Sequence, residues 1–319
     1  MQWTELPGTQ GLHPKARIND IAVASDRRWA VSSDGRLFSW VAKATTTPSP
    51  LANTPHARAI AFDSAGNVGW IGLFQRMLDP TLPRLLKTID GGVKWSAVMS
   101  LPQDCAAGFC GLSVVHPELA FGCGTFKSDV TPAVTRTTNG TDWEALKLPP
   151  NVNGLTDIEF WTEKHGMLIG QKLESGKTAP VILLTDNGGK AWQRAHIADT
   201  LIDGAHAWKV HRCCDKIAYV TVAGTGTQGV VLKSTDGGQS WNALSVNDPS
   251  ASINDWQLQG VGFVEADHGW VGQQGGAAFE TVDGGQSWHP ASGVLANLNR
   301  FAVTPEGFYA TGAAIYLGV

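Results

Sequence analysis

The octet Ser234-Thr235-Asp236-Gly237-Gly238-Gln239-Ser240-Trp241 decides the fold of this chain of 319 residues. An Asp side chain in such a stretch accepts hydrogen bonds from backbone N–H groups one to three residues further on and closes a tight loop. The two glycines suit positive-φ positions that other residues avoid. The octet therefore predicts a turn, and its tryptophan is expected to open the next strand and to pack between neighbouring sheets.

Four further copies of this turn occur, and their tryptophans are evenly spaced. The copies lie at 88–95, 137–143, 185–192 and 281–288. Successive tryptophans are 48, 49, 49 and 47 residues apart, which is about the length of one four-stranded blade of a β-propeller. We therefore assign a structural role to the five acidic or amide residues and the five tryptophans of these turns: Asp90, Asn139, Asn187, Asp236, Asp283, Trp95, Trp143, Trp192, Trp241 and Trp288.

A weaker repeat, with a large anchor residue followed by glycine, precedes each turn. Examples are Trp70-Ile71-Gly72 and Trp270-Val271-Gly272, and related stretches lie at 121–124, 167–170 and 219–224. Two more copies, at 29–32 and 308–312, have no turn after them. We interpret each copy as the second strand of a blade. Seven copies predict seven blades.

The two ends of the chain are predicted to complete one blade together. The last blade would stop after its third strand at 314–319, whereas Trp3-Thr4-Glu5-Leu6 resembles the strand after a turn, Trp143-Glu144-Ala145-Leu146. Residues 1–7 are therefore expected to supply the outer strand of the seventh blade and to protect its edge. The expected fold is all-β: a single seven-bladed β-propeller domain over 1–319. The first blade diverges, because the loop 44–48, without Asp or Gly, replaces its turn.

Composition and charge exclude several classes of protein. The net charge of −4 gives no basic field for nucleic acid. No segment reaches the roughly 18 to 20 apolar residues of a membrane helix, and the N-terminus does not read as a signal peptide. We expect a cytoplasmic monomer without membrane insertion, cofactor or metal.

The five cysteines show no CxxC spacing, so reduced thiols in a cytosolic protein are the favoured interpretation. The adjacent pair Cys213-Cys214 leaves a strained disulfide or a soft-metal site as the alternative.

The predicted binding face is the one opposite the turns, where hairpins and connectors between blades meet. Aligning the starts of the innermost strands gives one position per blade at the mouth of a central channel: Asn19, Arg58, Gly111, Thr156, His206, Gln259 and Asn299. Arg17, Arg58 and Arg300 come from adjacent blades and are expected to clamp a carboxylate or phosphate. The alternative is a water-filled channel lined by polar residues.

The longest hairpin, residues 73–84, carries Arg76 and Arg84 among apolar residues, a mixture that protein interfaces favour. The alternative is that these residues pack against their own blades. The candidate binding residues are Arg17, Asn19, Arg58, Arg76, Arg84, His206, Gln259 and Arg300.

The octets resemble the Asp-box, or BNR, repeat, a structural turn between the third and fourth strands of a blade. With 267–272 preceding the box at 281–288, the chain resembles the photosystem II stability/assembly factor-like family of seven-bladed Asp-box propellers. That resemblance implies an assembly or binding role with a protein partner and without catalysis.

The alternative function is a glycan-binding or glycosidase-like propeller, related to sialidases, that acts on an anionic sugar. Sialidases share Asp boxes and an arginine triad, but they have six blades, an Arg-Ile-Pro-type motif and a Tyr nucleophile. Here the motif reads Arg17-Ile18-Asn19, and the tyrosines, Tyr219, Tyr309 and Tyr316, fall within expected strands. Asp20 and Asp157, expected to be solvated surface acids, stay open as a carboxylate pair.

Overall fold

A computed structural model of the chain shows strands and turns and no helix among the residues that it describes. The described residues are 1–9, 16–41, 47–51, 57–74, 82–105, 107–124, 132–198, 204–224, 229–246, 258–274, 276–293, 297–304 and 307–319. They group into two compact units. One unit comprises residues 1–6, 169–184 and 193–319, and the other comprises 7–168 and 185–192.

The strands form seven separate sheets, and within each sheet most strands pair in chain order. The first three sheets are β2 (Ile18–Ala24), β3 (Arg27–Ser32), β4 (Arg36–Val41) and β5 (Thr47–Pro50); β6 (Ala57–Phe62), β7 (Gly69–Leu73), β8 (Leu85–Thr88) and β9 (Ser96–Ala97); and β10 (Phe109–His116), β11 (Leu119–Gly124), β12 (Ala133–Thr137) and β13 (Trp143–Leu146). The fourth is β14 (Val152–Phe160), β15 (Gly166–Glu174), β16 (Lys177–Thr185) and β17 (Gln193–Arg194).

The last three sheets contain the two departures from chain order. The fifth is β19 (His206–Arg212), β20 (Ala218–Ala223), β21 (Gly229–Ser234) and β22 (Ser240–Val246), and β18 (His196–Ile197) adds to β22 in parallel. The sixth is β23 (Leu258–Phe263), β24 (Gly269–Gln273), β25 (Ala278–Thr281) and β26 (His289–Pro290); the seventh is β27 (Arg300–Thr304), β28 (Gly307–Thr311), β29 (Ile315–Gly318) and β1 (Trp3–Glu5).

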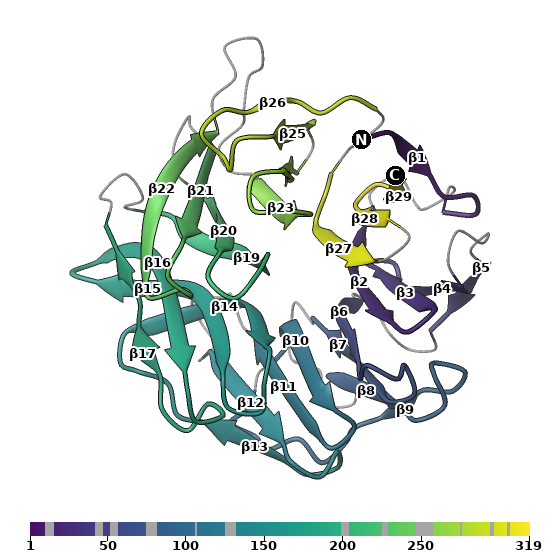
Figure 1. The fold of residues 1–319 in the computed structure, drawn as a ribbon. Coiled ribbons are helices and arrows are strands. Elements are labelled where there is room, and N and C mark those ends of the chain that lie inside the picture. Colours follow the sequence, from purple (N-terminus) through teal and green to yellow (C-terminus); the bar gives the residue numbers. More distant parts are fainter. Residues whose placement is uncertain are drawn as a thin grey trace. The chain divides into compact units, whose positions relative to one another are not determined.

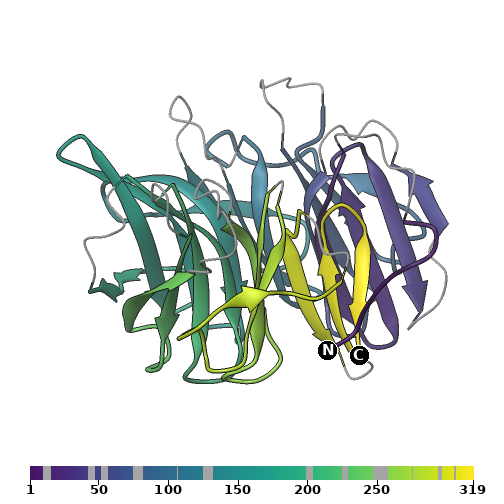
Figure 2. The ribbon, with the colours of Figure 1, turned by 90° about the horizontal axis from the view of Figure 1, so that it is seen from above.

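The N-terminal strand completes the seventh sheet. β1 pairs antiparallel with β29, with Thr4 opposite Leu317, and the two ends of the chain lie side by side (Figure 1 and Figure 2). The Trp3 ring packs edge-on against Trp270 of the sixth sheet, with ring centres 5.5 Å apart. The prediction that the N-terminal strand closes the seventh blade is confirmed, with Trp3–Glu5 as the strand.

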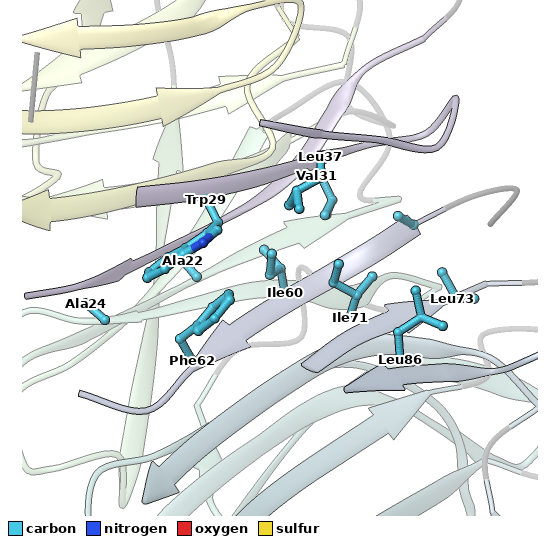
Figure 3. Close-up of a cluster of buried hydrophobic side chains, with 11 residues drawn as sticks. Ala22, Ala24, Trp29, Val31, Leu37, Ile60, Phe62, Ile71, Leu73 and Leu86 are labelled. Atoms are coloured by element: carbon cyan, nitrogen blue, oxygen red, sulfur yellow. The ribbon is translucent and has the colours of Figure 1, made fainter. Parts of the chain in front are cut away.

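Neighbouring sheets are joined by apolar clusters. Between the first and second sheets, Trp29 stacks on Phe62 with ring centres 3.8 Å apart, and Val31, Ile60 and Ile71 continue the cluster (Figure 3). The tryptophans of the turns pack as predicted: Trp143 joins a cluster with residues of β6–β8, and Trp288 one with residues of β20 and β21.

The glycine that recurs in the second strands is required by this packing. A Cβ on Gly72 would lie 2.6 Å from the Cβ of Phe109 on the next sheet, and one on Gly272 would lie 2.2 Å from the Cβ of Leu298. Real Cβ atoms do not approach so closely. The glycines therefore allow the inner strand of the next sheet to pack against the second strand.

Seven successive sheets, six of four strands and one that gains β18 as a fifth strand, give the chain the all-β, seven-bladed β-propeller fold. One expectation for the first blade is wrong: Thr47 and Pro48 belong to strand β5 and not to a loop. Proline is tolerated there because β5 is the outermost strand of its sheet.

Candidate functional site

The Asp boxes form the turns that the sequence predicts. In the fifth sheet, Asp236 Oδ1 accepts hydrogen bonds from Ser234 Oγ (2.8 Å) and Ser240 N (3.0 Å). Trp241 Nε1 donates to Gly238 O at 2.8 Å, and Gly238 has φ of 92°. Burial raises the pKa of the Asp236 carboxyl, but the hydrogen bonds from Ser240 and Ser234 outweigh it and lower this pKa to about 2. In the other boxes the side-chain oxygen of the Asp or Asn likewise accepts a backbone N–H bond from three or four residues further on, with Asn139 and Asn187 accepting through their amide oxygens.

The first glycine of each box fixes which end of the sheet the box occupies. Gly237 N donates to Lys216 O (2.9 Å), and Gly284 N donates to Asp267 O (2.8 Å). Both acceptors lie in the hairpin between the first and second strands of the same sheet. The opposite end of each sheet therefore holds the hairpin between strands two and three and the start of the innermost strand.

The carbonyl oxygen of that glycine accepts a hydrogen bond from a Lys or Arg side chain of the preceding sheet. Lys233 Nζ donates to Gly284 O (2.9 Å), Arg136 Nη1 donates to Gly188 O (2.8 Å), and Lys87 Nζ donates to Gly140 O. Sequence reasoning missed these residues. The signal was available, because each cation directly precedes the Ser or Thr that opens its own box.

The sixth sheet lacks this cation, and the sheet after it has no box. In the sixth sheet, Glu280 occupies the position of the cation, directly before the Thr that opens the box, and accepts a hydrogen bond from His268 Nε2 at 2.8 Å. The fourth sheet does not follow this pattern. Leu184, and not a cation, directly precedes the Thr that opens its box, although the fifth sheet after it has a box.

At the end opposite the boxes, bulges in the innermost strands set the direction of the candidate side chains. The register shifts between Ile18 and Asp20, and between Ala57 and Ala59. Asn19 and Arg58 therefore occupy equivalent bulge positions, as the alignment predicts, and Gln259 lies in the bulge between Leu258 and Val261.

In the third and fifth sheets the bulge lies beside the aligned residue. The third bulge holds Cys110, next to Gly111, and the fifth holds Trp208 and Lys209, whereas His206 is the first residue of β19. A bulge adds residues to one strand only, so sequence alignment does not place it in every blade. That the aligned residues meet at one channel mouth stays a prediction.

Arg17 and Arg58 lie close enough to influence each other. Arg17 directly precedes β2, and its backbone N–H donates to Ser33 Oγ at 3.0 Å. Burial, together with the positive charge of Arg58, lowers the pKa of Arg17. Arg300 opens β27 in the other compact unit, where its charge acts on His211. The convergence of Arg300 with the other two arginines stays a prediction.

The remaining polar candidates are largely buried. Asn19 Nδ2 donates to Ala57 O (2.7 Å), and Gln259 Nε2 donates to Gln274 Oε1 (3.0 Å). His206 lies beside the Trp208 ring, and burial lowers the pKa of His206 to about 4. The imidazole of His206 is therefore neutral at physiological pH.

Of the two candidate arginines in the long hairpin, Arg76 and Arg84, the structure describes only Arg84. Arg84 donates to the backbone carbonyls of Pro102 (3.3 Å) and Cys105 (3.2 Å), which fixes the following loop. Arg76 lies outside the described residues.

The acids expected at the surface are buried, which corrects the sequence-based expectation. Asp20 and Asp157 are 4% and 1% exposed. Asp20 accepts hydrogen bonds from the backbone N–H groups of Ile21 and Ile60, both at 3.0 Å, and so joins the first sheet to the second. A carboxylate in that position is a structural acceptor.

The tyrosines lie inside strands, as predicted. Tyr219, Tyr309 and Tyr316 are at most 2% exposed. Tyr219 donates its hydroxyl hydrogen to Ala266 O at 2.7 Å, and burial raises its pKa. All of the acids and tyrosines considered for glycosidase chemistry are therefore buried. Within the described residues there is also no cluster of three His, Cys, Asp or Glu side chains suited to a metal ion.

Comparison with known proteins agrees with this description. The sequence model of the family described as photosynthesis system II assembly factor YCF48 matches residues 135–250. The photosystem II assembly lipoprotein Ycf48 of Synechococcus sp. (strain CC9902) is 27% identical over 220 residues, which cover 62% of this chain and 58% of that protein. The chain thus spans less than two thirds of that relative.

Two solved structures match nearly the whole chain. YCF48 bound to D1 peptide has a TM-score of 0.69 at 18% identity, and the match covers all of this chain and 96% of that one. YCF48 from Cyanidioschyzon merolae has a TM-score of 0.67 at 17% identity, with 99% and 97% covered. At these identities the likeness shows the fold.

The fold and the boxes define the class: a seven-bladed Asp-box β-propeller. Within that class, the chain resembles the photosystem II assembly factors of the YCF48 type. No helix in the described part of the chain is long and apolar enough to cross a membrane.

Proposed function

We propose that this chain is a non-catalytic binding scaffold, an assembly or adaptor propeller that works as one domain and engages a protein partner at the sheet ends opposite the Asp boxes. The observation that carries the proposal is the Arg17–Arg58 pair. Two partly buried guanidinium groups repel each other there, and this repulsion contributes to the lowered pKa of Arg17. A carboxylate from a partner would relieve the repulsion and accept hydrogen bonds from both groups.

The box ends of the sheets support the same assignment by contrast. Their polar groups are already used in turns and in links between sheets, such as Lys233 to Gly284. The opposite ends carry bulges, which occur often next to functional sites because they redirect side chains. Arg58 and Gln259 sit in such bulges.

The relatives support a protein as the partner. One structural neighbour was solved with a D1 peptide bound. An acidic segment of an assembling protein is therefore the partner class that we propose for the Arg17–Arg58 site. The alternative ligand for the same two guanidinium groups is a small anion.

We further propose that the chain acts as a cytoplasmic monomer without nucleic acid. All five cysteines are free thiols, which supports a reducing compartment. Because the Synechococcus relative is named a lipoprotein, fractionation of the native host is the direct test, and recovery with membranes would overturn the cytoplasmic assignment.

The binding face is tested by charge removal with a matched control. Arg17→Gln/Arg58→Gln removes two positive charges from the proposed face, and Lys94→Gln/Lys190→Gln removes two exposed ones from the box ends. Each protein is used to capture partners from native lysate, with quantitative mass spectrometry, and a D1 peptide is titrated as a defined probe.

We expect the arginine variant to lose a partner that wild type and the lysine variant retain, and wild-type binding to weaken as salt rises. If all three proteins retain the same partners to the same extent, the proposed face is wrong.

A further inference from the structure

Cys213 and Cys214 lie side by side in the hairpin between β19 and β20, at the box end of the fifth sheet. Both backbone N–H groups point to one acceptor, Ile217 O, at 3.0 and 3.3 Å. The next residue but one, Lys216, accepts the bond from Gly237 of the box. The two thiols are thus held on a tight, well-anchored turn.

The two thiols differ in access. Cys214 is exposed, whereas Cys213 is half-buried. Their side chains are within hydrogen-bonding reach of each other. Burial, the neighbouring Cys214 and the carboxylates of Glu265 and Asp267 raise the pKa of the Cys213 thiol. Solvent therefore reaches the outer thiol of Cys214, whereas the inner thiol of Cys213 is partly shielded from it.

We propose that Cys213 and Cys214 form a reversible thiol–disulfide exchange site that is modified by small disulfides. The Cys214 thiolate attacks one sulfur of the small disulfide, which forms a mixed disulfide and releases one small thiolate. The Cys213 thiolate then attacks the Cys214 sulfur, which closes a Cys213–Cys214 disulfide and releases the second small thiolate. The protein loses two electrons and two protons, and the small disulfide is reduced to two thiols.

The position of the pair makes the product easy to reduce. Adjacent Cα atoms are about 3.8 Å apart, whereas disulfide-linked Cα atoms are usually about 4.4 to 6.8 Å apart. A disulfide between neighbours is therefore strained, and strained exposed disulfides are the labile ones. The site would form a disulfide under oxidising conditions and return to thiols when reductant is restored.

The charges around the turn predict which disulfides react faster. Arg212 is paired with Asp215 at 2.7 Å. The carboxylates of Glu265 and Asp267 both act on Cys213, whereas the turn carries one further cation, Lys216. A cationic disulfide such as cystamine should react several-fold faster than anionic glutathione disulfide. This difference should shrink at high salt.

The experiment follows the intact mass of the reduced, folded protein during exposure to cystamine. Wild type should pass through one adduct and end lighter by two hydrogens, with the change mapped to the peptide that contains 213–214. Dithiothreitol should reverse it. Cys213→Ser should stop at the mixed disulfide, and Cys214→Ser should react much more slowly. The buried Cys105, Cys110 and Cys123 serve as internal controls.

A wild-type adduct as persistent as that of Cys213→Ser would overturn ring closure, and reaction at the buried cysteines first would overturn the site. Equal rates with both disulfides at low salt would refute the charge argument. Melting curves of the two Ser variants check that both are folded. The site lies at the box end and is independent of the proposed partner face, so failure of one proposal leaves the other standing.

Discussion

The ammonium group of Lys233 donates a 2.9 Å hydrogen bond to the carbonyl of Gly284, and so joins the third strand of the fifth sheet to the Asp box of the sixth. The same ammonium lies 5.4 Å from the ring centre of Tyr219. Arg136 makes the equivalent bond to Gly188 in another pair of sheets. The box is thus more than a turn, because its glycine carbonyl is an attachment point for the preceding blade.

Removing this attachment should destabilise the protein. Lys233→Met keeps most of the apolar stem and removes the charged donor, so the Gly284 carbonyl loses its partner. We expect the free energy of unfolding to fall by about 1 to 2 kcal/mol in urea titrations. The exposed Lys190→Met is the control and should change it by less than about 0.5 kcal/mol. Equal effects of the two variants would show that the link contributes nothing.

The Asp boxes make a prediction that separates charge from hydrogen bonding. Asp236→Ala removes the acceptor of the Ser234 and Ser240 bonds and should cost about 1 kcal/mol. Asp236→Asn keeps an acceptor oxygen, as Asn139 and Asn187 do in their own boxes, and should be close to neutral at pH 7.

The pH dependence of the same two variants follows from the lowered pKa of Asp236, about 2 in the folded protein. Because the folded pKa lies below the unfolded value, this carboxylate stabilises the protein above about pH 4 and loses its effect as the pH falls toward 2. Between about pH 4 and pH 2, the urea concentration at the midpoint of unfolding should therefore fall less for Asp236→Asn than for wild type. An unchanged slope would contradict the assigned pKa.

The fold could be predicted from sequence because its signals are local and repeated. The Asp236 octet requires particular residues at particular turn positions, the spacing of the boxes gives the length of a blade, and the seven second-strand repeats give the number of blades. Bulges and burial are set instead by neighbouring sheets. The sequence therefore did not reveal that Asp20 accepts a hydrogen bond from Ile60 N of the next sheet, or that the bulge of the fifth sheet falls at Trp208 and Lys209.

His211 should make the protein sensitive to mild acid. Its Nε2 donates to Phe263 O at 3.0 Å, and burial lowers the pKa of His211 to about 4, with Arg300 adding to the effect. The unfolded chain, with a pKa near 6.5, takes up the proton first as the pH falls. Stability should be constant above about pH 6.5 and should decline between about pH 6.5 and 4.

The matched variant for this test is His211→Gln, whose amide keeps a donor for Phe263 O but does not titrate in this range. Urea midpoints at pH 7.5 and 5 should differ less in the variant than in wild type. The same difference in both proteins would mean that other groups account for the acid sensitivity.

The second-strand glycines should tolerate no side chain. A Cβ on Gly272 would lie 2.2 Å from the Cβ of Leu298 and 3.0 Å from its carbonyl oxygen. We expect Gly272→Ala to lower stability by about 3 kcal/mol, because the backbone of the next sheet must move. Gly176→Ala is the comparison: nothing lies within 4 Å there, and only the positive φ of 78° is strained. That strain corresponds to about 1 kcal/mol, so a larger effect at Gly176 would refute the packing argument.

The last prediction concerns the strand that completes the seventh blade. Deleting residues 1–6 removes the antiparallel pairing of Thr4 with Leu317 and uncovers the edge of β29. It also removes Trp3 from its contacts with Trp270 and Phe308. An uncovered edge strand pairs readily with other chains, so the deleted protein should melt at a lower temperature and aggregate more in light scattering.

A point variant separates the ring from the strand. Trp3→Ala keeps the backbone pairing and should lose about 2 kcal/mol, less than a fully buried tryptophan because Trp3 is half-buried. Trp3→Ala should melt at a lower temperature than wild type but should not aggregate more, because β1 still covers the edge of β29. If the deletion and Trp3→Ala behave alike in light scattering, the aromatic contact alone accounts for the role of this segment. The pairing with β29 would then not be what protects the edge.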